Sequence, residues 1–235
     1  MSCKIWACVN TKGGTGKTTL TAILASEIIR LGGSVALVDT DPNQPLENWQ
    51  NKFPKESRLP VLLDDDPDGA TLADTIERAT ELADFVLVDT EGSENMRMAR
   101  LPRFVDLILL PMQYSELDRQ EVEKVEAYLQ TLDERIDEPI PRIVVPTRVS
   151  AAIRTKTEKQ LRSSLTQADI PVLDPPILDK DAFKQMFTQG KLLQDLPSSS
   201  GIKSAQENAR AAFEGLAKTY SALKAQHRED QTVDA

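Results

Sequence analysis

The sequence is poor in the residues that build metal centres and disulfide scaffolds. Its 235 residues include two cysteines, Cys3 and Cys8, and a single histidine, His227. The cysteines are five residues apart in a predicted strand, so their side chains point to opposite faces and can hardly pair or share a metal ion. We therefore expect two reduced thiols, as in a cytoplasmic protein. With one histidine and these two cysteines, a zinc site or a Ser-His-Asp triad is strongly disfavoured.

Long apolar runs are also lacking. The longest stretches, such as 105–111, fall far short of the roughly 20 residues that a transmembrane helix needs. The N-terminus has no basic segment leading into an apolar one, so we expect no export signal. These features favour a soluble cytoplasmic protein that does not enter a membrane.

The charge of −9 is unevenly distributed along the chain. Residues 1–141 carry 14 basic and 26 acidic side chains, residues 142–228 carry 14 and 8, and the last seven residues add a charge of −3. A basic C-terminal third on an acidic body suggests one anion-facing side. An uneven scatter of solvated charges is the alternative.

Short apolar runs alternate with segments of helical periodicity. Runs of this kind, apolar on both faces, are typical of central strands in a parallel sheet covered by helices. We therefore predict a doubly wound α/β fold, with a mostly parallel sheet, helices on both faces and a ligand at the C-terminal strand ends. The predicted strands are 4–10, 34–39, 85–89, 105–110 and 142–145; the predicted helices are 18–31, 69–82, 116–132, 155–168, 181–189 and 208–226.

The chain shows no internal repeat, low-complexity segment or Gly/Ser linker. Its length suits one α/β domain with a buried sheet. We predict a single domain over residues 1–228, followed by an acidic flexible tail at 229–235.

A glycine-rich loop lies between the first predicted strand and the first helix, with the sequence Lys12-Gly13-Gly14-Thr15-Gly16-Lys17-Thr18-Thr19. Its glycines let successive N–H groups point at phosphates, Lys17 can reach the β and γ oxygens, and the Thr18 hydroxyl can bind Mg²⁺. The N-terminal end of the helix adds positive potential. The loop therefore predicts binding of ATP with Mg²⁺, although Thr11 replaces the first glycine of the ordinary P-loop pattern.

The extra lysine, Lys12, makes the loop resemble that of the ParA/MinD family of deviant Walker-A ATPases, which reads K-G-G-x-G-K-T-T. The resemblance implies a P-loop NTPase fold, slow ATP hydrolysis stimulated by a partner, and a homodimer across ATP. In that dimer, Lys12 and Lys17 would act as catalytic residues, with Lys12 reaching the partner's phosphates. A solvated lysine beside the loop is the alternative.

Two carboxylates complete the predicted site. Asp39-Thr40-Asp41-Pro42 matches the family's D-x-D-P switch segment, and the match implies that Asp41 positions the attacking water or a Mg²⁺-bound water. Asp89 ends an apolar run, as a Walker-B aspartate does, and is expected to hold Mg²⁺ through water. Helix capping is the alternative role for both.

The sequence departs from the family's pattern in both switch segments. Asn43 intervenes before Gln44, where family members usually have glutamine directly after D-x-D-P, and Glu91 stands where many members have proline. These departures concern the rate and trigger of hydrolysis rather than nucleotide binding.

The C-terminal half resembles the family more weakly. The segment 142–148 lies where family members end a strand beside the adenine. The resemblance therefore implies base contacts from Thr147, Arg148 and the Pro175-Pro176 loop. The segment 181–190 resembles a stretch of small ParA-like proteins, among them plasmid ParF-type proteins and the ParA-like protein that acts at transfer-DNA borders.

Basic residues in the C-terminal third predict contacts with duplex DNA phosphates without sequence preference. No aromatic residues lie between them, which disfavours stacking on single strands. The candidates are Arg154, Lys156, Lys159, Arg162, Lys184, Lys191, Lys203 and Arg210. A second group of arginines is at least as compatible with dimer or partner contacts as with DNA contacts: Arg97, Arg100 and Arg103.

The predicted function is an ATP-switched dimer that binds non-specific DNA at the nucleoid and partitions a cargo, most simply a plasmid reached through a ParB-like partner. Two alternatives stay open. One is a positioning ATPase for a protein cargo, such as a carboxysome or a chemoreceptor cluster. The other is an accessory DNA-binding ATPase in conjugative DNA transfer.

Overall fold

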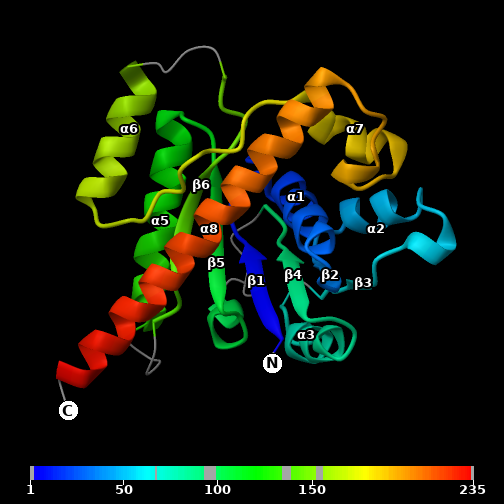
Figure 1. The fold of residues 1–235 in the computed structure, drawn as a ribbon. Helices are drawn as coiled ribbons and strands as arrows, with labels where there is room; N and C mark the ends of the chain where they lie inside the picture. The colour runs from blue at the N-terminus through cyan, green and yellow to red at the C-terminus, as the bar shows by residue number, and fades with distance from the viewer. Residues whose placement is uncertain (1–2, 67, 93–98, 134–138, 152–155, 234–235) are drawn as a thin grey trace.

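The computed structural model describes residues 3–66, 68–92, 99–133, 139–151 and 156–233. Its centre is a six-stranded sheet in the order β3-β2-β4-β1-β5-β6, in which every pairing is parallel (Figure 1). The strands are β1 (Lys4–Cys8), β2 (Val35–Asp39), β3 (Val61–Leu63), β4 (Phe85–Asp89), β5 (Leu107–Met112) and β6 (Arg142–Pro146). The predicted doubly wound α/β fold is confirmed.

Helices cover both faces of this sheet. The α-helices are α1 (Lys17–Arg30), α2 (Pro45–Gln50), α3 (Leu72–Thr80), α5 (Glu116–Asp133), α6 (Lys156–Gln167), α7 (Asp181–Gln189) and α8 (Ser200–Val233). Short 3₁₀ turns occur at Lys55–Ser57, Leu101–Arg103 and Leu193–Asp195. In the described parts of the chain, no helix combines the length and the apolar character needed to cross a membrane.

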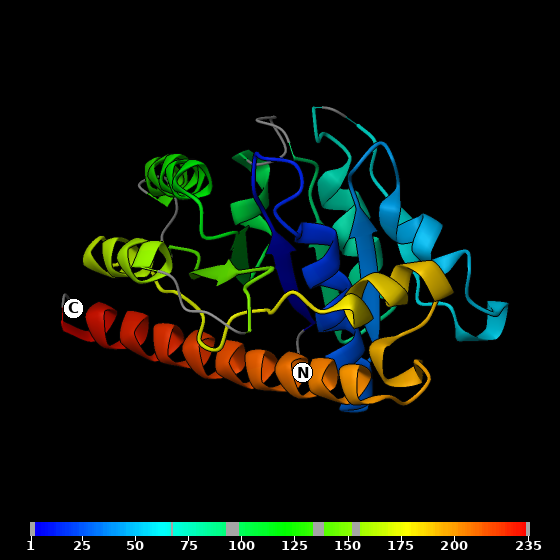
Figure 2. The same ribbon diagram turned by 90° about the horizontal axis from the view of Figure 1, so that it is seen from above.

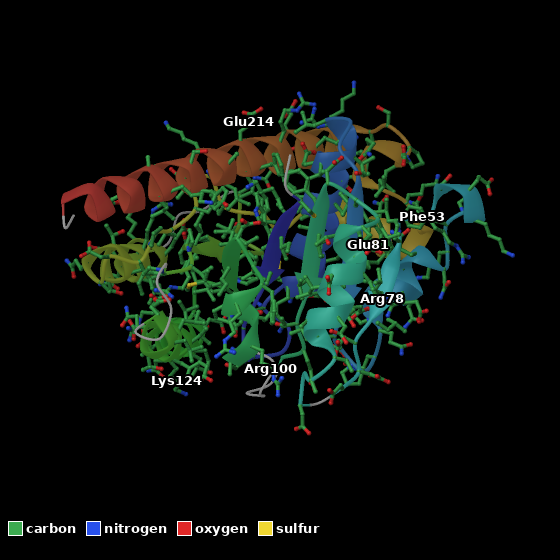
Figure 3. All side chains as sticks on the ribbon, turned by 90° about the horizontal axis from the view of Figure 1, so that it is seen from below. Phe53, Arg78, Glu81, Arg100, Lys124 and Glu214 are labelled. Atoms are coloured by element: carbon green, nitrogen blue, oxygen red, sulfur yellow. The ribbon has the colours of Figure 1, made fainter. Side chains whose placement is uncertain are left out.

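Two hydrophobic cores follow from the alternation of side chains along the strands. One core joins Cys8 and Leu37 to α1, α2, α7 and α8, and the other joins Val38 and Val88 to α3, α5 and α6. Figure 3 shows the two layers from below, with Glu214 of α8 and Lys124 of α5 on opposite sides of the sheet. Cys3 packs against the second core and Cys8 lies in the first, as their spacing predicts, and both thiols are free.

Helix α1 ends where its glycines predict. Gly32 adopts a φ of +83°, and Gly33 donates a hydrogen bond of 3.0 Å back to the Ile28 carbonyl. This is the usual way in which a left-handed glycine closes the last turn of a helix.

The structure differs from the sequence prediction in three places. The short elements β3 and α2 were not predicted, because three and six residues carry too little periodicity to register. Helix α8 begins at Ser200 and reaches Val233, whereas the prediction was 208–226. The helix thus includes most of the predicted flexible tail, and residues 234–235 lie outside the described part of the chain.

Candidate functional site

The glycine-rich loop connects β1 to α1 at the C-terminal edge of the sheet, which Figure 2 shows from above. Gly14 and Gly16 adopt φ values of +78° and +98°, a region that glycine enters without strain. Gly16 is the N-cap of α1, so the first N–H groups of that helix face the loop. The loop backbone therefore curls at its glycines directly before the N-terminal end of α1, as the sequence predicts.

Lys17 closes the loop from inside. Its Nζ donates hydrogen bonds to the carbonyls of Asn10, at 3.0 Å, and of Lys12, at 3.2 Å. Burial lowers the pKa of Lys17, while the negative charge of Asp89 is the largest influence in the opposite direction. Arriving phosphate oxygens can take over the roles of these carbonyls and keep the ammonium group paired.

Thr147 anchors the loop from β6. Its hydroxyl lies 2.6 Å from the Thr15 carbonyl and 3.2 Å from the Met112 carbonyl, and the residue is buried. A Cβ added to Gly16 would lie 3.3 Å from the Thr147 Oγ1. Thr147 was predicted as a base contact, and in this structure its hydroxyl bonds to the loop backbone.

A cavity of about 50 Å³ lies beside the loop. It is lined by Gly16, Thr19, Leu20, Thr147, Arg148, Ile177, Leu178, Asp179, Lys180, Phe183 and Lys184. Arg148, predicted as a base contact, lines this cavity with a left-handed φ of +52°. Pro176 is not in this lining: its carbonyl accepts a hydrogen bond from Asn208 of α8, and Ile177 faces the cavity in its place.

Three aspartates meet at the ends of two neighbouring strands. Asp39 and Asp89 are direct partners in the β2–β4 register, and Asp41 follows two residues after Asp39. Burial raises the pKa of Asp39 to about 6, although three backbone N–H groups oppose that rise. Asp39 accepts from Leu46 N at 2.8 Å and Glu47 N at 3.4 Å, so it caps α2. The predicted capping alternative thus describes Asp39 and not Asp41.

Asp89 is the group that most clearly calls for a cation. The residue is 1% exposed, and apart from the neighbouring Thr18 hydroxyl neither carboxylate oxygen has a hydrogen-bond partner in the described part of the chain. Burial raises the pKa of Asp89 to about 7, with the Thr18 hydroxyl as the main opposing influence. A buried carboxylate without donors is costly unless a cation compensates it. Asp89 and Thr18 therefore fit a Mg²⁺ site that phosphates and water would complete.

Lys12 points away from the loop. Its Nζ forms an ion pair with the Asp118 carboxylate of α5; the Lys12 side chain is 41% exposed and that of Asp118 is 2% exposed. Thr11 donates a 2.8 Å hydrogen bond to Glu121 of the same helix. Sequence reasoning missed both acidic partners.

A capping pattern could have marked Asp118. Its N–H lies 3.1 Å from Ser115 Oγ, and its Oδ2 accepts from the Gln113 N–H at 2.8 Å. This is the Ser-x-x-Asp arrangement of a helix start. It fixes the start of α5 beside the loop.

Comparison with known proteins assigns the family. The profile of the family described as VirC1 protein matches residues 3–226. The chain is also 30% identical over 203 residues to "Protein ParA" of Rhizobium radiobacter, covering 86% of this chain and 90% of that protein.

The chain belongs to the VirC1 family. It is a member of the wider ParA/MinD group of deviant Walker-A ATPases, as the loop sequence led us to expect.

Solved structures share the fold. An ATP complex of McdA from Cyanothece aligns with a TM-score of 0.68 at 17% identity, covering 92% of this chain and 97% of that one. MinD from Pyrococcus horikoshii, complexed with Mg-ADP, aligns with a TM-score of 0.63 at 20% identity, covering 88% and 94%. At these identities the likeness concerns the fold alone.

The predicted DNA-binding residues of this VirC1-family chain are not gathered on one surface. Those that the structure describes are carried by α6, α7, α8 and the loop after α7, and Figures 1 and 2 place α6 and α7 at opposite ends of the molecule. Arg162 pairs with Asp174 at 3.2 Å, and Lys184 pairs with Asp179 at 3.4 Å while lining the cavity. The described members with exposed side chains and no such role are Lys156, Lys159, Lys203 and Arg210; Lys191 is half-buried.

Two of the predicted residues, Arg154 and Arg97, lie outside the described residues. Arg100 and Arg103 are exposed around the turn before β5, and Figure 3 shows Arg100 on the same side of the sheet as Lys124 of α5.

Proposed function

We propose that this VirC1-family chain is a Mg²⁺-dependent switch ATPase that forms a homodimer with ATP and partitions DNA, most simply a plasmid. The observation that carries the proposal is the arrangement of Lys12, Lys17 and Asp89 around one loop, in a chain similar over most of its length to a ParA protein. Each of these residues has a separate task.

Lys17 and the loop N–H groups would hold the β and γ phosphates; the support for this is that Lys17 Nζ lies inside the loop, on the carbonyls of Asn10 and Lys12. Thr18 and Asp89 would hold Mg²⁺, which neutralises the charge that builds up on the phosphates. Asp41 would orient the attacking water.

Lys12 would make dimerisation depend on bound ATP. In the single chain, its ammonium group is paired with Asp118 and half-exposed at the rim of the loop. Reaching the phosphates of a second copy would break this ion pair and leave the buried Asp118 carboxylate without its cation, at a cost of about 3–5 kcal/mol. ATP bound between two copies would supply the compensating contacts.

DNA contacts would come from the exposed basic residues. Lys156 and Lys159 are two of them that lie three residues apart on α6. A dimer presents each such residue twice, and every phosphate neutralised steepens the salt dependence of binding. A ParB-like adaptor would stimulate hydrolysis and release the DNA.

The test is duplex DNA binding with and without Mg-ATP over a series of salt concentrations, with Lys17→Ala as the control variant. We expect ATP-dependent binding that weakens steeply with salt and is absent in Lys17→Ala. Absence of ATP-dependent binding even at low salt would refute the DNA-carrier proposal and favour a protein cargo.

A second candidate is an accessory role in conjugative DNA transfer, favoured by the VirC1 family match over residues 3–226. The two candidates differ in sequence preference. Competition between a duplex that carries a transfer-border sequence and a scrambled duplex of equal length separates them: a partition ATPase binds both equally, whereas a transfer factor prefers the first.

A further inference from the structure

Asn43 makes two hydrogen bonds to one oxygen of Asp41. Its backbone N–H donates to Asp41 Oδ1 at 2.8 Å, and its side-chain Nδ2 donates to the same oxygen at 2.9 Å. The Gln44 N–H closes the turn with a 2.8 Å hydrogen bond to the Asp41 carbonyl. Two donors on one carboxylate oxygen restrict rotation of the carboxylate and leave its other oxygen as the one available for a further contact.

The turn that holds Asn43 is fixed to buried structure. Asn48 Nδ2 donates to the Asn43 carbonyl at 2.9 Å, which ties the turn to α2. The indole of Trp49, on the same helix, donates a buried 3.0 Å hydrogen bond to the Met186 carbonyl of α7. At the start of the same helix, the Leu46 N–H donates a hydrogen bond to the Asp39 carboxylate. The contacts of Asn43 itself are exposed, and they tie its turn to a helix that is held by buried hydrogen bonds.

The Asp41 carboxylate lies close to the rest of the site. Its negative charge is one of those that raise the pKa of Lys17, after Asp89 and Cys8, while burial lowers it. Asp41 N also donates to Asp39 Oδ1 at 3.2 Å, which joins the two aspartates. A small rotation of the Asp41 carboxylate would therefore change the position of its negative charge relative to Lys17 and to a bound γ-phosphate.

We propose that Asn43 is a positioning residue for Asp41: its side-chain amide holds Oδ1 and so fixes the oxygen that orients the attacking water. This inference rests on the proposed function, because it concerns the hydrolysis step. In that step the water oxygen bonds to the γ-phosphorus, the bond to the bridging oxygen breaks, and the two water protons pass to the released phosphate and to solvent. Asn43 exchanges no atoms in this reaction.

The test compares single-turnover hydrolysis of Mg-ATP with ATP affinity in the full chain. Asn43→Ala removes the side-chain donor and keeps the backbone donor, and we expect a rate roughly tenfold lower with ATP affinity unchanged. Asn51→Ala is the matched control: Asn51 lies at the other end of α2, and its Oδ1 accepts a 3.1 Å hydrogen bond from Arg58, away from Asp41. We expect the control to keep the wild-type rate, and Asn43→Ser, which restores a short donor, to recover part of the loss.

Each remaining outcome is informative. Wild-type rates in Asn43→Ala, or an equal loss in Asn51→Ala, would overturn the inference and leave the ATPase proposal standing. A loss of ATP affinity that matches the loss of rate would show a merely structural role and would also overturn it. Failure of the wild-type chain to hydrolyse ATP would overturn the inference together with the proposed function.

Discussion

Replacing Asp89 with asparagine should stabilise the protein while disabling the proposed metal site. Asp89 is buried, and among the described residues the Thr18 hydroxyl is the one group that can donate to its oxygens. Its pKa rises from an ordinary 3.8 to about 7, so the folded chain holds this proton more tightly than the unfolded chain does. Stability is therefore lost as the pH rises from about 4 to 7, and the full penalty applies above pH 7.

The size of the effect follows from that shift. A change of about three pKa units, at about 1.4 kcal/mol each, is a penalty of about 4 kcal/mol. The asparagine amide would also be buried without partners, which costs about 1–3 kcal/mol. The net gain in the free energy of unfolding is then about 2 kcal/mol, or roughly 4–8 °C in Tm for a chain of this size.

Thermal unfolding in EDTA measures this gain directly. We expect Asp89→Asn to melt above the wild type at pH 8, with a difference that shrinks towards pH 5. Added Mg-ATP should raise the Tm of the wild type but not that of the variant. Asp118→Asn is the matched control, since Asp118 is equally buried but paired with Lys12 and the Gln113 N–H, and it should lower the Tm. An Asp89→Asn protein that melts below the wild type at pH 8 would refute this reasoning.

Two further substitutions test the support of the loop. Thr147→Val keeps the shape of the side chain but leaves the Thr15 carbonyl without its 2.6 Å partner. ATP affinity measured by titration should therefore fall several-fold. Unchanged affinity would mean that the loop keeps its conformation without this hydrogen bond. In Gly92→Ala, the added Cβ would lie 2.9 Å from the Gly13 nitrogen. The loop must then shift, and we expect roughly a tenfold weaker ATP affinity, whereas Gly201→Ala, where the nearest atom is 3.9 Å away, should bind like the wild type.

The sequence was sufficient for the features that depend on local pattern. Apolar runs alternating with helical segments predict a parallel sheet, and the glycines before Lys17 predict the loop. Asp89 could be placed because a carboxylate that ends a buried strand in such a sheet lies at the ligand edge. These inferences need no knowledge of which strands are neighbours.

Contacts between distant segments could not be predicted in this way. The pair Lys12–Asp118 joins residues 106 positions apart, and the bond from Thr147 to Thr15 joins residues 132 apart. Both depend on the order of β1, β5 and β6 in the sheet, which local periodicity does not specify. The basic residues show the same limit, because spacing places Lys156 and Lys184 on helix faces but not on opposite ends of the molecule.

In the proposed switch, ATP controls dimerisation through Lys12. The most direct test of this control is the molar mass of the wild type and of Lys12→Ala, measured by sedimentation with and without Mg-ATP, alongside ATP affinity. We predict that the wild type doubles its mass only with Mg-ATP, while Lys12→Ala binds ATP and stays monomeric. A Lys12→Ala protein that still forms the ATP-dependent dimer would contradict the account.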